Sequence, residues 1–477
     1  MAFRFAPGRP PAVAAEGMVA TSQLLATRAG LRALERGGNA ADAVLAAAAV
    51  LCVAEPMSTG IGGDAFALVW RDGGVEGLDS AGPAPAGAEP LPVALSGPRS
   101  VTVPGAVAGW AALAERYGRL GLDACLADAI DAAERGVAVG FHTAGYWRAS
   151  PAAPQELGPP PAVGARFRLP ELGATLRAIS TGGAQAFYGG AVGSAIAAAS
   201  WLEESDLLRF RPRWVEPLRL AYRGHEVVEL PPPTQGVAAL RGLGLLALGE
   251  PDLASQVACM QLALEDASER VRDGAEVSDL LEPGSLARRR AEAPPPAGEP
   301  AGGTVYLCAV DADRMAVSFI QSLYEPFGSG VVAPGTGVVL QNRGACFAVG
   351  GRVEPGRRPY HTIIPGLLLR DGALAGPFGV MGGFVQAQAH LQLVSALVDE
   401  SLDPQAALDR PRFRVEGDAV RLEEGLWDRA GELAGLGHRV ICDQEITPFG
   451  GGQAILVEGD ALLGGSDARK DGYAGGI

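Results

Sequence analysis

A proline-rich break at residues 283–303 most constrains how this chain can fold. The segment (PGSLARRRAEAPPPAGEPAGG) carries several charges and little bulky apolar content, which is typical of an exposed linker. The run TVYLCAVDADRMAVSFIQS follows it directly, and its two β-rich halves flank a turn at residues 311–314. This pattern predicts a hairpin whose first residue is Thr304.

Periodic apolar residues predict helices and strands on both sides of this break. Helices are expected over residues 22–35, 40–54, 107–119, 172–180, 191–200, 237–248 and 257–272. Strands are expected over residues 64–70, 74–78 and the alternating segment 218–230. Runs of helices together with antiparallel strand pairs predict an α+β protein with layered sheets.

Charge and motif content argue against several classes of function. The 477 residues carry a net charge of −15, Lys470 is the only lysine, and the basic cluster Arg288-Arg289-Arg290 falls within the expected linker. We expect these arginines to be solvated and expect no nucleic-acid partner. The five histidines lack the spacing of metal ligands, and no GxxxxGK[ST] motif is present. We therefore expect neither a metal nor an organic cofactor.

The N-terminus and the cysteines point to a cytoplasmic protein. The first 23 residues contain no apolar run of signal-peptide length, and no segment approaches 18 uninterrupted apolar residues. We therefore expect neither a secretory leader nor a membrane span. The cysteines at positions 52, 125, 259, 308, 346 and 442 lack CxxC pairing, and we expect all six to be reduced core residues.

Thr304 occupies a position that suits nucleophilic catalysis. A threonine hydroxyl is a weak nucleophile until a base removes its proton, and one solution is the residue's own α-amine, freed by cutting the chain before it. A free α-amine has a pKa of about 7.7–8.0 and is partly neutral in cells. Taken alone, however, a threonine that opens a strand is more often there for its β propensity.

Ordered motifs along the whole chain resemble the γ-glutamyltransferase family. RALERGGNAADAVLAAAAVLCVAEPMSTGIGGDAFALVW is similar to its long N-terminal signature, and TVYLCAVDADRMAVSFIQSLYEPFGSGVVAPGTGVVLQN resembles the start of its small subunit. The other similar segments, in family order, are SVTVPGAVAGW, AFYGG, RPRWVEPLRLAYRGHEVVELPPPTQG, RRPYHTIIPGLLL, GVMGGFVQAQAH and FGGGQAI. The sequences of these motifs are most similar to the branch of the family that contains oxamate amidohydrolase.

The resemblance implies a fold and a maturation step. Members of the family are four-layer αββα sandwiches of the N-terminal-nucleophile hydrolase type, made as one chain that cuts itself. Here the cut is expected between Gly303 and Thr304. It would leave a large subunit of residues 1–303, ending in the exposed linker, and a small subunit of residues 304–477, packed together as one domain.

The same resemblance implies roles for individual residues. Thr304 aligns with the nucleophile, and Ser322 with a second hydroxyl residue that hydrogen-bonds it. Gly382-Gly383 match the paired glycines whose backbone N–H groups form the oxyanion hole, where glycine lets the backbone approach closely. His361 and Thr362 stand in place of a serine pair that contacts the substrate carboxylate. From the residues alone, His361 is equally well an anion ligand or a satisfied, partly buried histidine.

The substrate pocket departs from the family's γ-glutamyl pattern. Asp79 or Ser80 falls where the family has the arginine that holds the α-carboxylate. Cys346 stands at the position of the aspartate that pairs with the α-amine, and Tyr324 at that of a neighbouring asparagine. Each lost charge-assisted contact is worth on the order of 1.5–3 kcal/mol. Arg343 and His361 are alternative groups for a small carboxylate.

The implied function is a self-processing amide hydrolase or acyltransferase that works through an acyl-Thr304 intermediate. Its substrate would be a small carboxylate-bearing amide, γ-glutamyl or oxamate-like. Two alternatives remain open at this point. The chain is a non-catalytic binding or scaffold protein with the family fold, or it hydrolyses another acyl bond in a biosynthetic pathway.

Overall fold

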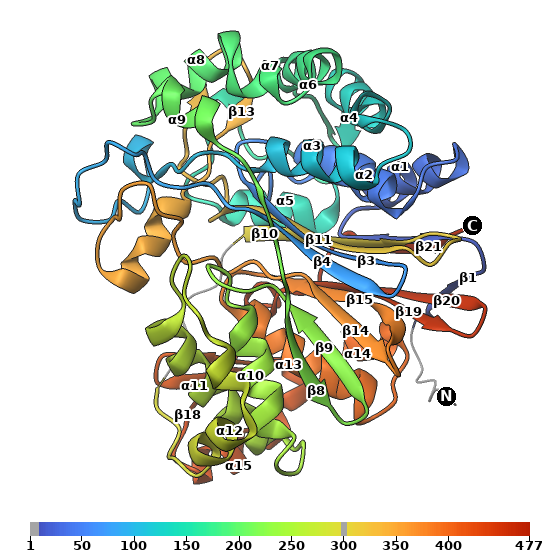
Figure 1. Cartoon of the computed structure of the whole chain (residues 1–477), viewed down its shortest axis with the longest axis vertical. Helices are drawn as coiled ribbons and strands as arrows, with labels where there is room; N and C mark the ends of the chain where they lie inside the picture. The colour runs from blue at the N-terminus through green and yellow to red at the C-terminus, as the bar shows by residue number, and fades with distance from the viewer. Residues whose placement is uncertain (1–8, 297–302) are drawn as a thin grey trace.

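Two seven-stranded antiparallel sheets lie face to face at the centre of the molecule (Figure 1). The computed structural model describes residues 9–296 and 303–477. The sheet that carries Thr304, here the β10 sheet, has the order β21 (Tyr473–Gly476), β2 (Met18–Thr21), β10 (Gly303–Val310), β11 (Ala316–Tyr324), β3 (Asp64–Arg71), β4 (Gly74–Ser80), β7 (Arg213–Val215). The other, the β15 sheet, has the order β1 (Ala12–Ala14), β20 (Ala461–Ser466), β19 (Gly451–Glu458), β15 (Ala373–Met381), β14 (Gly366–Arg370), β9 (His225–Glu229), β8 (Leu218–Tyr222).

Helices cover the outer face of each sheet, which completes four layers (Figure 1). The β10 sheet is covered by α1 (Leu24–Glu35), α2 (Ala40–Ala54), α3 (Ala106–Tyr117) and α4 (Leu122–Arg135), with α6 (Pro170–Gly182) and α8 (Gly190–Ala199) beyond them. The β15 sheet is covered by α10 (Gly236–Leu246), α11 (Leu253–Arg270) and α13 (Val385–Val398). The expected α+β fold with a four-layer αββα sandwich is confirmed.

Three apolar cores hold the layers together. One lies between α1–α4 and the β10 sheet, one between α10, α11, α13 and the β15 sheet, and the third between the two sheets. The alanine-rich α2 is buried along its whole length, and small side chains let it pack closely against α1 and α4. Asn39 and Asp42 form a capping box that satisfies the first amides of α2. Large helix-to-sheet interfaces of this kind fix the strand ends on which the candidate site lies.

Three sequence expectations are corrected. Residues 218–230 form two strands, β8 and β9, because Arg223 and Gly224 take positive φ values of 45° and 81° in a tight turn. The expected linker begins with a helix, α12 (Pro283–Arg290), which has proline in its first turn and packs against α10. Arg289 is not solvated, because it pairs with three carboxylates, those of Glu265, Asp266 and Glu292. Residues 297–302 of the linker lie outside the described part.

The cysteines differ from expectation at one position. Five of them are buried thiols in the cores, while Cys442 at the end of β18 (Arg439–Cys442) is exposed. The strand β18 pairs only with β17 (Ala419–Leu422), in a small three-stranded sheet with β16 (Phe413–Glu416). Cys442 is exposed because this small sheet lies at the edge of the molecule rather than between the main layers.

Candidate active site

Thr304 lies at the start of β10, where a β-bulge interrupts the pairing with β11. Beyond the pair formed by Gly303 and Tyr324, two residues of β11, Ser322 and Leu323, oppose the single Thr304. Bulges re-aim side chains at strand ends. Thr304 is only 2% exposed, and its Oγ1 lies 2.6 Å from the carbonyl oxygen of Gly303. The hydroxyl is therefore held against the peptide bond that precedes it.

Ser322 is the hydrogen-bonding centre of the site. Its Oγ accepts from the backbone N–H of Tyr324 at 2.7 Å and from Nη2 of Arg343 at 3.2 Å. The Ser322 hydroxyl donates its proton to the Gly303 carbonyl oxygen at 2.8 Å, and Thr304 Oγ1 donates to Ser322 Oγ at 3.2 Å. Ser322 is thus committed as a donor toward this peptide bond.

Arg343 is a fully buried guanidinium behind Ser322. It opens a 3-10 helix, Arg343–Gly350, and its Nη1 lies 3.1 Å from Thr362 Oγ1 and 3.6 Å from the sulfur of Cys346. The guanidinium stacks on the ring of Tyr324, 4.6 Å from its centroid. Within the described residues Arg343 forms no ion pair, and its Nε has no hydrogen-bond partner.

Gly382 and Gly383 form the turn between β15 and α13. Their φ values are +133° and +69°, and the first lies in a region that residues with a Cβ rarely adopt. In the described part of the chain neither amide donates to another backbone group. The turn directly precedes the N-terminus of α13, whose dipole favours negative charge. This arrangement suits an oxyanion-binding turn.

His361 and Thr362 lie beside Arg343, but they differ in what they can bind. The two ring nitrogens of His361 face the Pro359 carbonyl at 2.7 Å and the Asp64 carboxylate at 2.9 Å. Asp64 is itself buried and accepts from two backbone amides and a glutamine side chain. Both ring nitrogens are engaged, so the satisfied-histidine alternative is favoured over direct contact with a substrate. The Thr362 hydroxyl accepts from Arg343.

At the position of the family's arginine this chain has an acidic residue, which belongs to a buried ion pair. Asp79, at the end of β4, pairs with Arg358 at 3.1 Å, and burial raises the pKa of Asp79 above its ordinary value. Arg358 also donates to the backbone carbonyls of Ala81 and Arg211. Ser80 donates to a backbone carbonyl. This corner therefore offers no uncommitted cation among the described residues.

The structure adds two glutamines that sequence reasoning missed. Gln235 Nε2 donates to the Thr362 carbonyl at 2.5 Å and to the Gly383 carbonyl at 3.3 Å, which ties the oxyanion turn to the Arg343 side. Gln386 Nε2 lies 3.5 Å from Thr304 Oγ1, and its Oε1 accepts from a backbone amide of the neighbouring loop. Gln235 precedes the first residue of α10 and Gln386 is one of several polar residues in α13, so neither stands out in the sequence.

A cavity of about 540 Å³ lies next to this cluster. Its walls include Tyr360 and Phe384, the neighbours of His361 and Gly383, with rings stacked 5.6 Å apart. Pro296, the last described residue before the gap, also lines it. Thr304 and Arg343 are buried and do not line this cavity.

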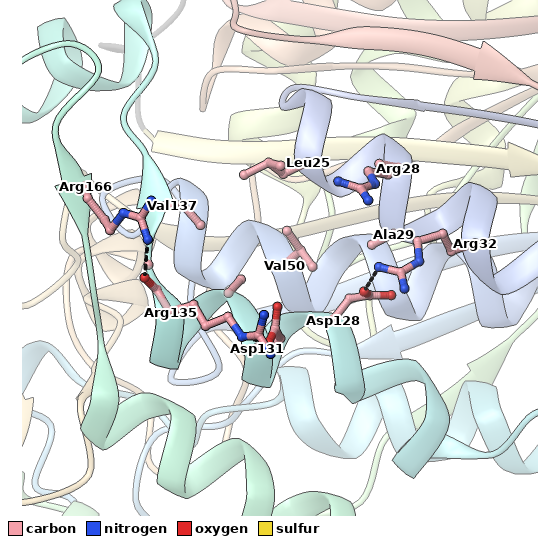
Figure 2. A pocket seen from close by; sticks show the side chains of 12 residues that line it. Leu25, Arg28, Ala29, Arg32, Val50, Asp128, Asp131, Arg135, Val137 and Arg166 are labelled. Carbon is pink, nitrogen blue, oxygen red and sulfur yellow. Dashed lines mark hydrogen bonds and ion pairs between the residues drawn. The ribbon is translucent and has the colours of Figure 1, made fainter.

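A second cavity, of about 280 Å³, lies between α1, α2 and α4 (Figure 2). The carboxylates in its wall are neutralised by arginines: Arg32 pairs with Asp128 at 2.6 Å and Arg135 with Asp131 at 2.6 Å. None of the residues expected in the site lines it. We therefore place no chemistry there.

The described part of the chain offers neither a cluster of metal ligands nor a membrane-spanning helix. Residues 9–296 and 303–477 contain no group of three or more His, Cys, Asp or Glu side chains that could hold a metal ion. Over the same residues, no helix is both long and apolar enough to cross a bilayer.

Comparison with known proteins gives consistent relatives. The family model described as Gamma-glutamyltranspeptidase matches residues 26–477. The glutathione hydrolase-like YwrD proenzyme of Bacillus subtilis is 32% identical, over 96% of this chain and 98% of its own. The oxamate amidohydrolase proenzyme of Klebsiella pneumoniae is 33% identical, over 97% and 99%.

A solved structure agrees with the fold. The crystal structure of cephalosporin acylase from Bacillus halodurans superposes with a TM-score of 0.93 at 38% identity, covering 100% of this chain and 98% of that one. The expected fold of the N-terminal-nucleophile hydrolases is thereby confirmed. The chain belongs to the gamma-glutamyltranspeptidase family and is an enzyme of its amide-hydrolysing and acyl-transferring type.

Proposed function

We propose that the chain cuts itself between Gly303 and Thr304 and then uses Thr304 as an N-terminal nucleophile on small amides. One observation carries the proposal. Thr304 Oγ1 lies 2.6 Å from the oxygen of its own preceding carbonyl, which also accepts from Ser322 at 2.8 Å. A nucleophile, a carbonyl and a donor are thus assembled on one peptide bond.

Self-cleavage would proceed as an N-to-O acyl shift. Thr304 Oγ1 forms a bond to the Gly303 carbonyl carbon, and its proton passes to the departing Thr304 nitrogen as the C–N bond breaks. Negative charge on the Gly303 oxygen is stabilised by the Ser322 hydroxyl, with the Arg343 charge behind it. Water then hydrolyses the ester and yields a Gly303 carboxylate and a free Thr304 amine. Fragments of 303 and 174 residues result from the 477.

Turnover would use the freed amine as the base. It takes the Oγ1 proton while the oxygen attacks a substrate carbonyl, and the N–H groups of Gly382 and Gly383 stabilise the oxyanion. The amine of the substrate departs with a proton and leaves an acyl-Thr304 ester. Water, or an amine acceptor in a transfer reaction, then attacks the ester and regenerates the hydroxyl.

The acyl group is proposed to carry a carboxylate but not to be a typical γ-glutamyl group. Asp79 and Arg358 neutralise each other where the family holds the α-carboxylate, and Cys346 offers no anion for an α-amine because burial raises the pKa of its thiol. The oxamate amidohydrolase among the relatives supports this choice. Retention of Thr304 and Ser322 in contact argues against a scaffold role.

A substrate panel tests the proposal. Processed protein would be offered oxamate, related small amido acids, γ-glutamyl amides and neutral acyl amides, and ammonia or amine release would be measured against Thr304→Ala. We expect turnover of a small carboxylate-bearing amide that depends on Thr304. Turnover of γ-glutamyl compounds at ordinary affinity would show that the pocket assignment is wrong, and turnover by Thr304→Ala would refute the nucleophile.

A further inference from the structure

The guanidinium of Arg343 has a charge that the described protein does not neutralise. Its side chain is 0% exposed, yet its partners among the described residues are two hydroxyls, a thiol and an aromatic ring, none of them an anion. Burying an unpaired charge costs several kcal/mol. Glu325 is close enough for Arg343 to offset part of the burial that raises the pKa of that carboxyl, but the two form no ion pair. Proteins retain such an unpaired buried charge where a ligand supplies the opposite charge.

One end of the guanidinium is connected to the nucleophile through a single side chain. Nη2 reaches Ser322, and Ser322 reaches Thr304, so the guanidinium stands one side chain away from Thr304 Oγ1. Nε, which has no partner, is available as a second donor for the bidentate contact that carboxylates make with arginine. The Gly303 carbonyl oxygen lies within hydrogen-bond distance of both the Thr304 and the Ser322 hydroxyl. Cleavage and departure of this carbonyl would leave a donor-lined space.

The two contacts set a length for what fits this space. Each is 3.2 Å, so Nη2 and Thr304 Oγ1 are at most about 6.4 Å apart. A carboxylate hydrogen bond takes about 2.8 Å and an ester C–O bond about 1.4 Å of this line. At most about 2 Å remains between the acyl carbon and the nearer carboxylate oxygen. A carboxylate bonded directly to the acyl carbon fits that separation, whereas three intervening carbons do not.

Resting on the proposed function, we infer that Arg343 is the carboxylate receptor of the acyl site and selects monoamides of the shortest dicarboxylic acids. The Thr362 hydroxyl holds the guanidinium from one side and the Tyr324 ring from the other, so the receptor is preorganised. An oxamate-type acyl group places its carboxylate on Arg343 when its carbonyl carbon is on Thr304 Oγ1. Longer diacid monoamides must bend or displace Ser322.

The test compares chain length and charge in one series. Ammonia release by processed protein would be measured with the monoamides of oxalic, malonic, succinic and glutaric acids, and with oxamide, the uncharged isostere of oxamate. We expect kcat/KM to fall along the acid series and to be higher for oxamate than for oxamide. Arg343→Gln should lower kcat/KM for oxamate roughly 10- to 100-fold more than it lowers kcat/KM for oxamide, the equivalent of one charge-assisted contact.

The controls separate this inference from the proposed function. Arg343→Lys retains a positive charge but lacks the paired donors with which arginine binds both oxygens of a carboxylate. Its kcat/KM for oxamate should lie between those of the wild type and Arg343→Gln. Equal losses on oxamate and oxamide would overturn the receptor role and leave only a positioning role. Should Arg343→Gln fail to process, inhibition of the wild type by oxalate, malonate, succinate and glutarate decides instead: weakening along that order supports the receptor, and glutarate as the tightest overturns it. Absence of Thr304-dependent turnover on every amide would refute the proposed function itself.

Discussion

Replacing Ser322 by alanine tests the hydrogen-bond arrangement at the Gly303–Thr304 peptide bond. The hydroxyl is the side-chain donor to the Gly303 oxygen, at 2.8 Å. Removal of one donor aimed at a developing oxyanion slows a reaction by about 10²- to 10³-fold. The substitution also leaves the Tyr324 N–H without its acceptor, which costs about 1–3 kcal/mol in the free energy of unfolding. We expect self-cleavage of Ser322→Ala to slow by two to three orders of magnitude in a chain that still folds.

The assay is a time course on denaturing gels that follows loss of the intact chain. Ser322→Thr, which keeps the hydroxyl, should cleave within about tenfold of the wild type. Ser318→Ala is the matched control, because Ser318 is a buried serine on the same strand whose hydroxyl contacts Tyr306 at 2.7 Å instead. It should lose stability without losing cleavage. Cleavage of Ser322→Ala within threefold of the wild type would refute the reasoning.

Two further predictions concern the oxyanion turn and a buried carboxyl. Gly382→Ala places a Cβ 2.7 Å from Val385 at a φ of +133°, so we expect turnover to fall about 10²-fold or more. The control is Gly459→Ala, which lies in an open turn at a φ of +58° and should leave turnover unchanged. Equal effects of the two substitutions on turnover would argue against a role of the Gly382 turn in oxyanion binding. Burial raises the pKa of Glu55 from 4.5 to about 7, so its contribution to stability is present below pH 4.5 and lost as pH rises through 7, by about 3 kcal/mol. Denaturant unfolding at pH 5 and pH 8 should show this loss of unfolding free energy in the wild type and not in Glu55→Gln. If Glu55→Gln loses as much unfolding free energy between pH 5 and pH 8 as the wild type does, the assignment to Glu55 is wrong.

The layered fold of this protein could be predicted from its sequence because the patterns that indicate its helices and strands are local and long. The alanine run gives α2 the bounds 40–54 that its pattern predicts, and the hairpin that begins near Thr304 is a strict two-strand pattern. The turn at Arg223–Gly224 was missed because an arginine at positive φ has no sequence signature. Helix α12 was missed because proline in a first helical turn resembles a linker proline.

In the candidate site, too, some residues could be predicted from local sequence motifs, whereas contacts between residues far apart in the sequence could not. Thr304, Ser322 and Gly382-Gly383 could be predicted as site residues because they lie inside recognisable motifs, and their roles stay a prediction. The commitment of His361 to Asp64, and of Arg358 to Asp79, depends on side chains almost 300 residues apart in sequence. No spacing rule relates such pairs. The lone charge of Arg343 is visible only once the ion pairs of its surroundings are known.

The most direct test of the account is the identity of the residue that becomes both a new N-terminus and an acyl carrier. Purified wild type and Thr304→Ala would be measured as intact masses, before and after a rapid acid quench with substrate. The account predicts a 174-residue fragment that begins at Thr304, gains the acyl mass on Thr304 during turnover, and does not form in Thr304→Ala. A wild-type chain that stays whole, or an acyl group carried by another residue, would contradict it.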